Sequence, residues 1–456
     1  APTAQPLLMS LPRLLRNGLR YWRAFGTRAL IHELQRRLTT PVPPGMMPTA
    51  LPPPEPAPSS SRAANPHPAQ ALVQARFGQS APLTVFTVPR TGRPRISVVT
   101  DSINRGSLFG GVGTCMLLAA LLVKRRGARL RIITRTEPSQ TANLQHVLQL
   151  YGLSLDDEVE FAFAHVQAPQ ASVNVFEDEL FITTSWWTTE STLAAVAPSR
   201  ILYVLQEDER MFYPGGDDHL RCARVLSRDD VHVAINTPGL LEHLADSGLP
   251  HRRRTARAFE PAFPPSVYRR QPRTPGARRT LMFYARPNHL RNLFYFGLEV
   301  LDAAVAQGVI DTSRYEILFV GAHVPAVSLC DGTVPTVHEH LSWTDYAALA
   351  GRVDVALSLM YTPHPSYPPL DLAASGAVVV TNRFGNKTSL AHSCGNILAA
   401  DLTVPALLQA LRDAIALADD DAERQRRFEQ RGLQTDWAQS LASVVEHYGQ
   451  RSDAWA

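Results

Sequence analysis

The sequence has little cysteine and no long uncharged apolar run. Four cysteines occur in 456 residues, and no two of them form a CxxC pair. Disulfide frameworks and structural zinc sites depend on more thiols at closer spacing, so this pattern predicts a protein of the reducing cytoplasm. A helix that crosses a membrane needs about 18 or more consecutive apolar residues, and the sequence contains no such run.

Net charge is small, and several common ligand motifs are missing. The formal net charge is +4, which gives no reason to expect nucleic acid as a partner. No glycine-rich turn is followed by Gly-Lys-Ser/Thr, so there is no Walker loop. No Asp-x-Asp ends an apolar strand, and the isolated pair His338 and His340 lacks a third ligand. The residues themselves therefore give no sign of a metal or cofactor site.

The chain divides into five parts by composition and periodicity. A content of 45% hydrophobic residues over this length is too much for one ordinary core and predicts two domains. Apolar strands alternate with helical patterns in both domains, which is typical of α/β folds with parallel sheets. The expected parts are a basic helical segment at 1–40, a proline-rich linker at 41–90, an N-terminal domain at 91–265, a C-terminal domain at 266–400 and a helical tail at 401–456.

The amino-terminal part is basic and amphipathic. Residues 1–40 contain seven arginines and one acid, and leucines with two aromatic rings recur at helical spacing over residues 7–38. Such a segment can lie on an anionic membrane surface or bind a partner, but a helix packed on the protein's own core has the same pattern. Eleven prolines between Pro41 and Pro68 predict an extended linker after it.

A glycine-rich turn opens the first domain. The expected strand Ile96–Thr100 is followed by a turn that ends in Gly110-Gly111-Val-Gly113 and by an apolar helix. Glycine lets the backbone pass close to a ligand, and the amino end of the helix offers unpaired N–H groups to an anion. Gly111 and Gly113 are therefore candidate binding residues. A tight turn without a ligand has the same pattern.

Two later strands of this domain are followed by side chains that could take part in binding or catalysis, a pair of tryptophans and a group of three acids. Trp186 and Trp187 follow one strand, and indoles stack well on sugar rings. The other strand leads into Glu207, Asp208 and Glu209, and crowded acids raise one another's pKa, which suits a group that handles a proton. The alternatives are a tryptophan pair in the core and a solvated acidic turn.

Two arginines follow the first strand of the second domain. The strand Thr280–Tyr284 leads into Arg286 and Arg291, and a helix is expected from Leu293 to Ala306. Guanidinium groups match the oxygens of a diphosphate, so the pair is a candidate clamp for one. Exposed arginine is also common at strand ends without any ligand.

The stretch Asp354–Asn382 is the most distinctive part of the sequence. Apolar strands at Val355–Met360 and Ala377–Thr381 flank a loop, Tyr361–Pro369, that contains four prolines and cannot be helical. A short helix follows and ends at Gly376. Open α/β sheets bind ligands beyond the carboxyl ends of their strands, which makes this loop a candidate site. The candidates here are His364, Ser366, Tyr367, Asp371 and, in the next loop, Lys387.

The same stretch carries a resemblance to a known family. Asp371-Leu-Ala-Ala-Ser-Gly376 followed by Ala-Val-Val-Val resembles the acidic segment of GT-B glycosyltransferases of the family 4 type. The pattern SLM-x-x-PHPSYPPL, with TSWWT and the Gln-Glu-Asp-Glu segment, is similar to bacterial rhamnosyltransferases that use dTDP-rhamnose. Pro363 stands where the family has its first acid, and Asp371 replaces its second glutamate.

The resemblance implies a GT-B fold, with two Rossmann-like parallel-sheet domains facing a cleft. It implies a metal-independent and retaining transfer of a sugar, with Glu207, Asp208 and His364 as the candidate catalytic residues and Trp186 and Trp187 binding the acceptor. The implied donor-binding residues are Gly111, Gly113, Arg286, Arg291, Ser366, Tyr367, Asp371 and Lys387.

We expect the partners to be dTDP-rhamnose and a glycan or lipid-linked acceptor in bacterial polysaccharide synthesis. The expected location is the cytoplasm, with contact to the inner face of the cell membrane through residues 7–38. An epimerase of nucleotide sugars and a non-catalytic carbohydrate-binding scaffold are the alternative functions.

Overall fold

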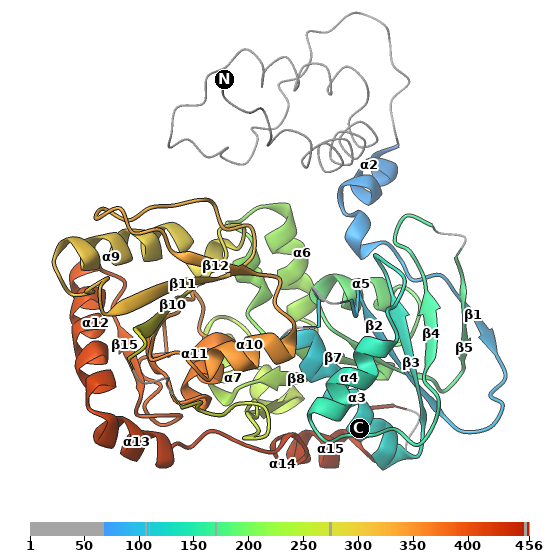
Figure 1. Cartoon of the computed structure of the whole chain (residues 1–456). Helices are drawn as coiled ribbons and strands as arrows, with labels where there is room; N and C mark the ends of the chain where they lie inside the picture. Colours follow the sequence, from blue (N-terminus) through green and yellow to red (C-terminus); the bar gives the residue numbers. More distant parts are fainter. Residues whose placement is uncertain are drawn as a thin grey trace, which may run out of the picture. The chain divides into compact units, whose positions relative to one another are not determined.

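The computed structural model describes residues 68–104, 107–108, 110–168, 171–272, 276–450 and 454–455. Residues 69–456 form one compact unit, which contains two parallel sheets with helices on both faces (Figure 1). The basic segment and its predicted membrane contact, together with residues 41–67 of the linker, lie outside the described residues.

The first sheet has seven strands in the order β4-β3-β2-β6-β7-β8-β9, and every neighbouring pair is parallel. Its central strands are buried because helices cover both faces, which explains their largely apolar sequences, whereas the edge strand β4 is partly exposed. The strands are β2 (Arg95–Thr100), β3 (Arg129–Thr134), β4 (Glu160–Phe163), β6 (Leu180–Thr183), β7 (Ile201–Leu205), β8 (His232–Asn236) and β9 (Ala256–Phe259). The helices are α3 (Gly111–Arg126), α4 (Ala142–Leu150), α5 (Trp186–Leu193), α6 (Asp217–Leu226), α7 (Pro238–Asp246) and α8 (Arg252–Thr255).

The second sheet has six parallel strands in the order β12-β11-β10-β13-β14-β15. One face packs against α9 and α12 and the other against α10 and α11 (Figure 1). The strands are β10 (Arg279–Ala285), β11 (Tyr315–Gly321), β12 (Thr336–Glu339), β13 (Val355–Leu357), β14 (Val378–Asn382) and β15 (Ile397–Ala400). The helices are α9 (Phe294–Ala306), α10 (Trp343–Ala350) and α11 (Tyr367–Ala374).

Both sheets reverse their winding direction once. In the first sheet the chain runs outward from β2 to β4 and then returns to β6 on the other side of β2. In the second sheet it runs from β10 to β12 and returns to β13 beside β10. Ligands bind at such switch points because the loops there diverge and leave a crevice. The glycine turn follows β2, and both Arg286 and the proline-rich loop flank the switch point between β10 and β13.

The carboxyl-terminal helices return from the second sheet to the first. Helix α12 (Val404–Asp419) packs in the core of the second sheet, followed by α13 (Asp421–Glu429). Helices α14 (Trp437–Ser440) and α15 (Ala442–Tyr448) place apolar side chains in the core beside α3. A backbone hydrogen bond from Phe263 N–H to the Gln434 carbonyl ties this return to the outgoing connection.

The sequence predicted the two parallel-sheet domains correctly but not all of their elements. Residues 69–90, which composition assigned to the linker, contain α2 (Ala69–Arg76), the 3-10 turn Gly78–Ser80 and β1 (Val85–Val88). Strand β1 pairs in parallel with β5 (Val173–Phe176) in a separate two-stranded sheet. The short strands β9, β12 and β15 were not predicted. Strand β13 ends at Leu357, earlier than expected.

Candidate active site

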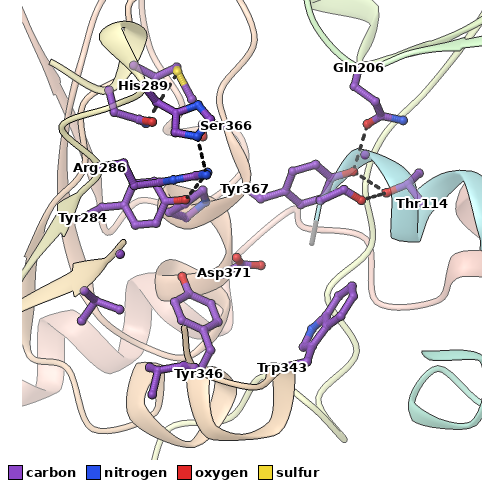
Figure 2. Close-up of a pocket in the computed structure, with 18 of the residues that line it drawn as sticks. Thr114, Gln206, Tyr284, Arg286, His289, Trp343, Tyr346, Ser366, Tyr367 and Asp371 are labelled. Atoms are coloured by element: carbon purple, nitrogen blue, oxygen red, sulfur yellow. Dashed lines mark hydrogen bonds between the residues drawn. The ribbon is translucent and has the colours of Figure 1, made fainter. Parts of the chain in front are cut away.

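One cavity lies where the two switch points face each other. It has a volume of about 560 Å³ and is lined by residues of both domains. Figure 2 shows Thr114 and Gln206 of the first domain opposite Tyr367, Asp371 and Arg286 of the second. Of the predicted site residues, the lining includes Gly111, Glu207, Arg286, Arg291, His364, Ser366, Tyr367 and Asp371.

The glycine turn forms one wall of the cavity. Gly110 has φ of 65° and precedes α3, while a Cβ atom on Gly111 would lie 2.5 Å from Cγ of Gln206. The close approach therefore requires glycine at position 111. Gly113 does not line the cavity. A Cβ atom there would lie 2.6 Å from the Leu108 carbonyl and 3.0 Å from the Trp343 ring, so this glycine allows helix packing.

The proline-rich loop places His364 at the cavity with a defined tautomer. The backbone N–H of Ser366 donates to Nδ1 of His364 at 3.0 Å, so Nδ1 is the acceptor and the ring proton lies on Nε2. Burial, together with the nearby charges of Lys387 and Arg291, lowers the pKa of His364 to about 3. His364 is therefore a neutral hydrogen-bond donor. Ser366, with φ of 69°, holds the strained turn before α11.

Three cations of the second domain lie around this loop. Arg286 contacts Nε2 of His289 at 2.6 Å and the Tyr284 hydroxyl at 3.4 Å (Figure 2). Arg291 lies with its guanidinium 4.1 Å from the centre of the Phe212 ring in the first domain. Lys387 does not line the cavity but lies behind the loop, where it donates to the Met360 carbonyl at 3.0 Å. Burial lowers the pKa of Lys387 to about 8.

Glu207 reaches across the cleft, whereas the two acids after it do not. Its carboxylate accepts from Thr362 Oγ1 at 3.3 Å and lies 3.4 Å from Nη1 of Arg291 and 3.5 Å from Nδ1 of His364. Burial raises the pKa of Glu207 to about 7, and Arg291 only partly offsets this effect. The crowding of acids, which the sequence suggested as the cause, contributes little.

Asp208 and Glu209 have structural partners outside the cavity. Burial disfavours ionisation of Asp208, but hydrogen bonds from His243 and Arg210 outweigh it and lower the pKa to about 2. The Arg210 guanidinium contacts both carboxylate oxygens of Asp208, at 2.8 and 2.7 Å. Glu209 is buried and accepts from the Trp186 backbone N–H at 2.7 Å. The predicted catalytic residue Asp208 thus lies apart from the other candidates.

Asp371 occupies the floor of the cavity on α11 (Figure 2). Burial raises its pKa to about 8, and the nearby hydroxyls of Tyr268 and Tyr346 only partly offset this effect. The carboxyl group is therefore mostly protonated near neutral pH. In this form it can both donate and accept a hydrogen bond.

The predicted acceptor-binding tryptophans do not line the cavity. Trp186 is fully buried in the core, and its Nε1 donates to the Tyr213 hydroxyl at 2.9 Å. Nε1 of Trp187 donates to the carboxylate of Asp101 at 2.9 and 3.0 Å. Helix α5 begins at Trp186 itself and is capped by Ser185. Trp186 is thus a core residue, as the alternative had it, whereas Trp187 is half-buried beside that core and contacts the residue that follows β2.

The cavity is rich in buried polar atoms that have no hydrogen-bond partner among the described residues. Such atoms are rare in folded proteins because leaving one unpaired costs about 1–3 kcal/mol. Their concentration in one cavity indicates a polar ligand. Seven such atoms belong to residues that line the cavity. Two of them, Glu207 Oε2 and Arg291 Nη1, form an ion pair with each other at 3.4 Å. The other five are Gln206 Nε2, Tyr346 Oη, His364 Nε2, Asp371 Oδ1 and Trp437 Nε1.

The described part of the chain contains neither a cluster of metal ligands nor a helix that could span a membrane. No group of three or more histidine, cysteine, aspartate or glutamate side chains is arranged to hold a metal ion. No described helix is long and apolar enough to cross a membrane.

Comparison with known proteins assigns the two domains. Residues 95–236 match the N-terminal domain of WsaF, and residues 279–412 match its C-terminal domain. Together the matches cover more than half of the chain. Sucrose-phosphate synthase of Thermosynechococcus elongatus has the same fold, with a TM-score of 0.52, 13% identity and coverage of 78% of this chain and 98% of that chain. The chain belongs to the WsaF family and has the GT-B fold.

Two further proteins resemble this chain. HepE of Anabaena, solved in complex with UDP and glucose, matches with a TM-score of 0.52 and 12% identity over 77% of this chain and 98% of that one. The O-antigen biosynthesis protein RfbC of Myxococcus xanthus is 28% identical over 373 residues. That match covers 81% of this chain, which spans only 28% of the length of RfbC.

Several residues that line the cavity were not predicted. Gln206 directly follows β7, and Thr114 lies in the first turn of α3, just after the glycine turn. Both positions are near the carboxyl ends of strands, which could have marked the two residues as site candidates. Trp343 and Tyr346 belong to α10, and their part in the cavity depends on how that helix packs. Tyr268 comes from the connection between the domains. Nothing in the local sequence distinguishes these three from ordinary core aromatics.

Proposed function

We propose that this protein is a glycosyltransferase that moves L-rhamnose from dTDP-rhamnose to a hydroxyl of a glycan or lipid-linked acceptor in bacterial surface polysaccharide synthesis. The observation that carries the proposal is the cavity at both switch points, with five buried polar atoms that lack a partner among the described residues and the ion pair of Glu207 and Arg291. A nucleotide sugar presents hydroxyls and phosphate oxygens that can pair with such atoms. The cavity volume of about 560 Å³ is within the usual range for small-molecule sites.

The second domain is suited to hold the donor. Arg286 and Arg291 line the cavity beside β10, and their guanidinium groups would bind the diphosphate and stabilise its charge as it leaves. Lys387, with a pKa lowered to about 8, gains a proton more readily when an anion binds nearby. Asp371 would pair with hydroxyls of the ribose. These cations take the part that a metal plays in other transferases, so we propose a metal-independent reaction.

The first domain is suited to receive the acceptor. In the transfer, the bond between the anomeric carbon and the diphosphate oxygen breaks, and a bond from the acceptor oxygen to the same carbon forms. The acceptor proton leaves, and Glu207 is the carboxylate of the cavity with a pKa near 7 that can accept it. His364 would donate from Nε2 to an oxygen of the sugar or of the leaving group. We propose that the anomeric configuration is retained.

The choice of rhamnose and of surface polysaccharide is supported by two similarities. The segment from Ser358 to Leu370 resembles rhamnosyltransferases that use dTDP-rhamnose. The relative RfbC is described as an O-antigen biosynthesis protein. The basic segment at residues 7–38 supports a proposed contact with the membrane surface, where lipid-linked acceptors are found.

Incubation of the protein with labelled nucleotide sugars and synthetic glycosides tests the proposal. Each donor, including dTDP-rhamnose and UDP-glucose, is offered with and without a rhamnoside acceptor, in buffer that contains EDTA. We expect transfer from dTDP-rhamnose with EDTA present. Conversion of the donor without acceptor would indicate an epimerase, and binding without turnover would indicate a scaffold. Transfer from UDP-glucose and not from dTDP-rhamnose would overturn the proposed donor, but the protein would still be a glycosyltransferase.

A further inference from the structure

The side chain of Tyr367 crosses the cleft between the domains. Tyr367 is the first residue of α11, and the prolines on both sides of the Ser366–Tyr367 pair restrict the backbone there. Its ring lines the cavity on the side of the second domain, and its hydroxyl lies among Thr114, Gln206 and Asn236 of the first domain (Figure 2). The direction of this side chain therefore links α11 to the first sheet.

The hydrogen bonds at this hydroxyl form a directed chain. Nδ2 of Asn236 donates to the Tyr367 oxygen at 2.9 Å, and its second hydrogen goes to Gln206 Oε1 at 2.7 Å. Oγ1 of Thr114 donates to the Gly110 carbonyl at 3.1 Å, so it accepts the Tyr367 proton across a distance of 2.6 Å. The chain runs from Asn236 through Tyr367 and Thr114 to the glycine turn.

This arrangement leaves the Tyr367 hydroxyl little capacity for a ligand. Its one proton has two acceptors within reach, Thr114 Oγ1 at 2.6 Å and Gln206 Oε1 at 3.4 Å, and both belong to the first domain. One of its lone pairs accepts from Asn236. Asp371 lies four residues later on the same face of α11 and lines the same cavity. A ligand that contacts Asp371 therefore contacts α11, the same helix that holds the glycine turn through Tyr367.

We propose that Tyr367 is a positioning residue that fastens the glycine turn and the ends of β7 and β8 to α11 when the two domains are closed. The expected effect of Tyr367 on the reaction rate rests on the proposed transfer reaction. The structural link between α11 and the first domain does not depend on that reaction. Tyr367 would then act on the acceptor side of the reaction through Thr114 and Gln206, and not by contact with the donor.

The first test compares Tyr367→Phe with Tyr315→Phe. Tyr315 is a suitable control because its hydroxyl is buried at the amino end of β11 and has no partner among the described residues. A spin label on native Cys330, the exposed cysteine of the four, is paired with one at Leu220→Cys on α6 in the other domain. We expect Tyr367→Phe to lengthen and broaden the distance distribution and Tyr315→Phe to leave it unchanged. An unchanged distribution in Tyr367→Phe would overturn the proposal.

The second test separates positioning from donor contact. We expect Tyr367→Phe to keep the dissociation constants of dTDP and UDP within about threefold while kcat falls about tenfold, the value of one such bond. Thr114→Val should have the same effect, and the double variant should be no worse than either alone. A tenfold loss of affinity for these nucleotides, or additive losses in kcat, would overturn the proposal. Absence of transfer by the wild type would remove the proposed function, while the distance measurement would still decide the role of Tyr367.

Discussion

The two domains share one sheet plan but differ in how the residues after their strands are used. In the second domain, Arg286 after β10 and the loop after β13 both face the cavity. In the first domain, the indoles after β6 are buried or bound to Asp101, while Gln206 and Glu207 after the neighbouring strand β7 line the cavity. The linkers are of similar length, since two residues separate β6 from α5 and three separate β7 from the following 3-10 turn. The difference lies in where the side chains are, because the indoles belong to α5 itself, whereas Gln206 and Glu207 belong to the linker after β7. A polar residue in the linker after a strand is therefore the better site candidate.

The largest expected effect is the loss of a cation from the second domain. Replacement of Arg286 by alanine removes a guanidinium that lines the cavity and leaves the donor diphosphate without that charge. We expect kcat/KM to fall about 10²–10³-fold and nucleotide affinity to fall with it. Steady-state kinetics and calorimetry with dTDP measure both quantities.

Arg314→Ala is the matched control, because Arg314 is an exposed arginine of the same domain that pairs with Asp419. If Arg286→Ala behaves like Arg314→Ala, then the strand end of β10 carries no donor site, and the contrast between the domains fails.

On the other side of the cleft, Glu207→Gln should lower kcat about 10²-fold. Because burial raises the pKa of Glu207 to about 7, the wild-type rate should rise as pH increases through 7, and the variant should lack this rise. The raised pKa also means that the native state loses stability as pH increases from about 4.5 to 7, since only the unfolded state is then fully ionised. A pH series of rates and of thermal unfolding shows both effects.

Asp208→Asn provides the contrast for Glu207, because Asp208 lies next in sequence but outside the cavity. It should destabilise the protein by removing the partner of Arg210, without changing the pH at which the rate rises. If Asp208→Asn shifts the pH at which the rate rises, then Asp208 and not Glu207 is the carboxylate whose ionisation controls the rate.

The third expected effect is on the pH dependence of stability through Asp371. Its pKa is raised to about 8, so the wild-type protein loses stability as pH increases from about 3.8 to 8. Asp371→Asn removes this dependence and should gain stability relative to the wild type over that range, by at least about 1.4 kcal/mol, the value of one pKa unit. Thermal unfolding at pH 5 and pH 9 measures the difference. A constant difference at the two pH values would contradict the protonated state of Asp371.

The sequence was informative where local chemistry decides the structure and uninformative where packing decides it. Continuous apolar strands, glycine and proline predicted both sheets and the loop around His364, because these features act through the backbone of their own segment. Most of the donor-side candidates consequently line the cavity. The tyrosines and tryptophan of the cavity floor come from α10 and from the connection between domains, and their position depends on contacts between distant segments. The buried cluster around Glu207 likewise forms only when the domains meet, so neither its partners nor the cause of its raised pKa could be predicted.

The smallest expected effect concerns the tryptophan that the sequence assigned to the acceptor. Trp187→Leu removes the hydrogen bonds to Asp101 and should lower the free energy of unfolding by about 1–3 kcal/mol, with the acceptor KM changed less than about threefold. Trp187→Phe keeps an aromatic ring and separates the two roles. If the indole stacked on a sugar, phenylalanine would partly restore the KM that leucine impairs. If the indole supports the strand end through Asp101, as its hydrogen bonds indicate, neither variant alters KM, and phenylalanine, which cannot donate to Asp101, also lowers stability. Acceptor kinetics with denaturant unfolding of both variants therefore show whether β6 differs from β7 in function as it does in structure.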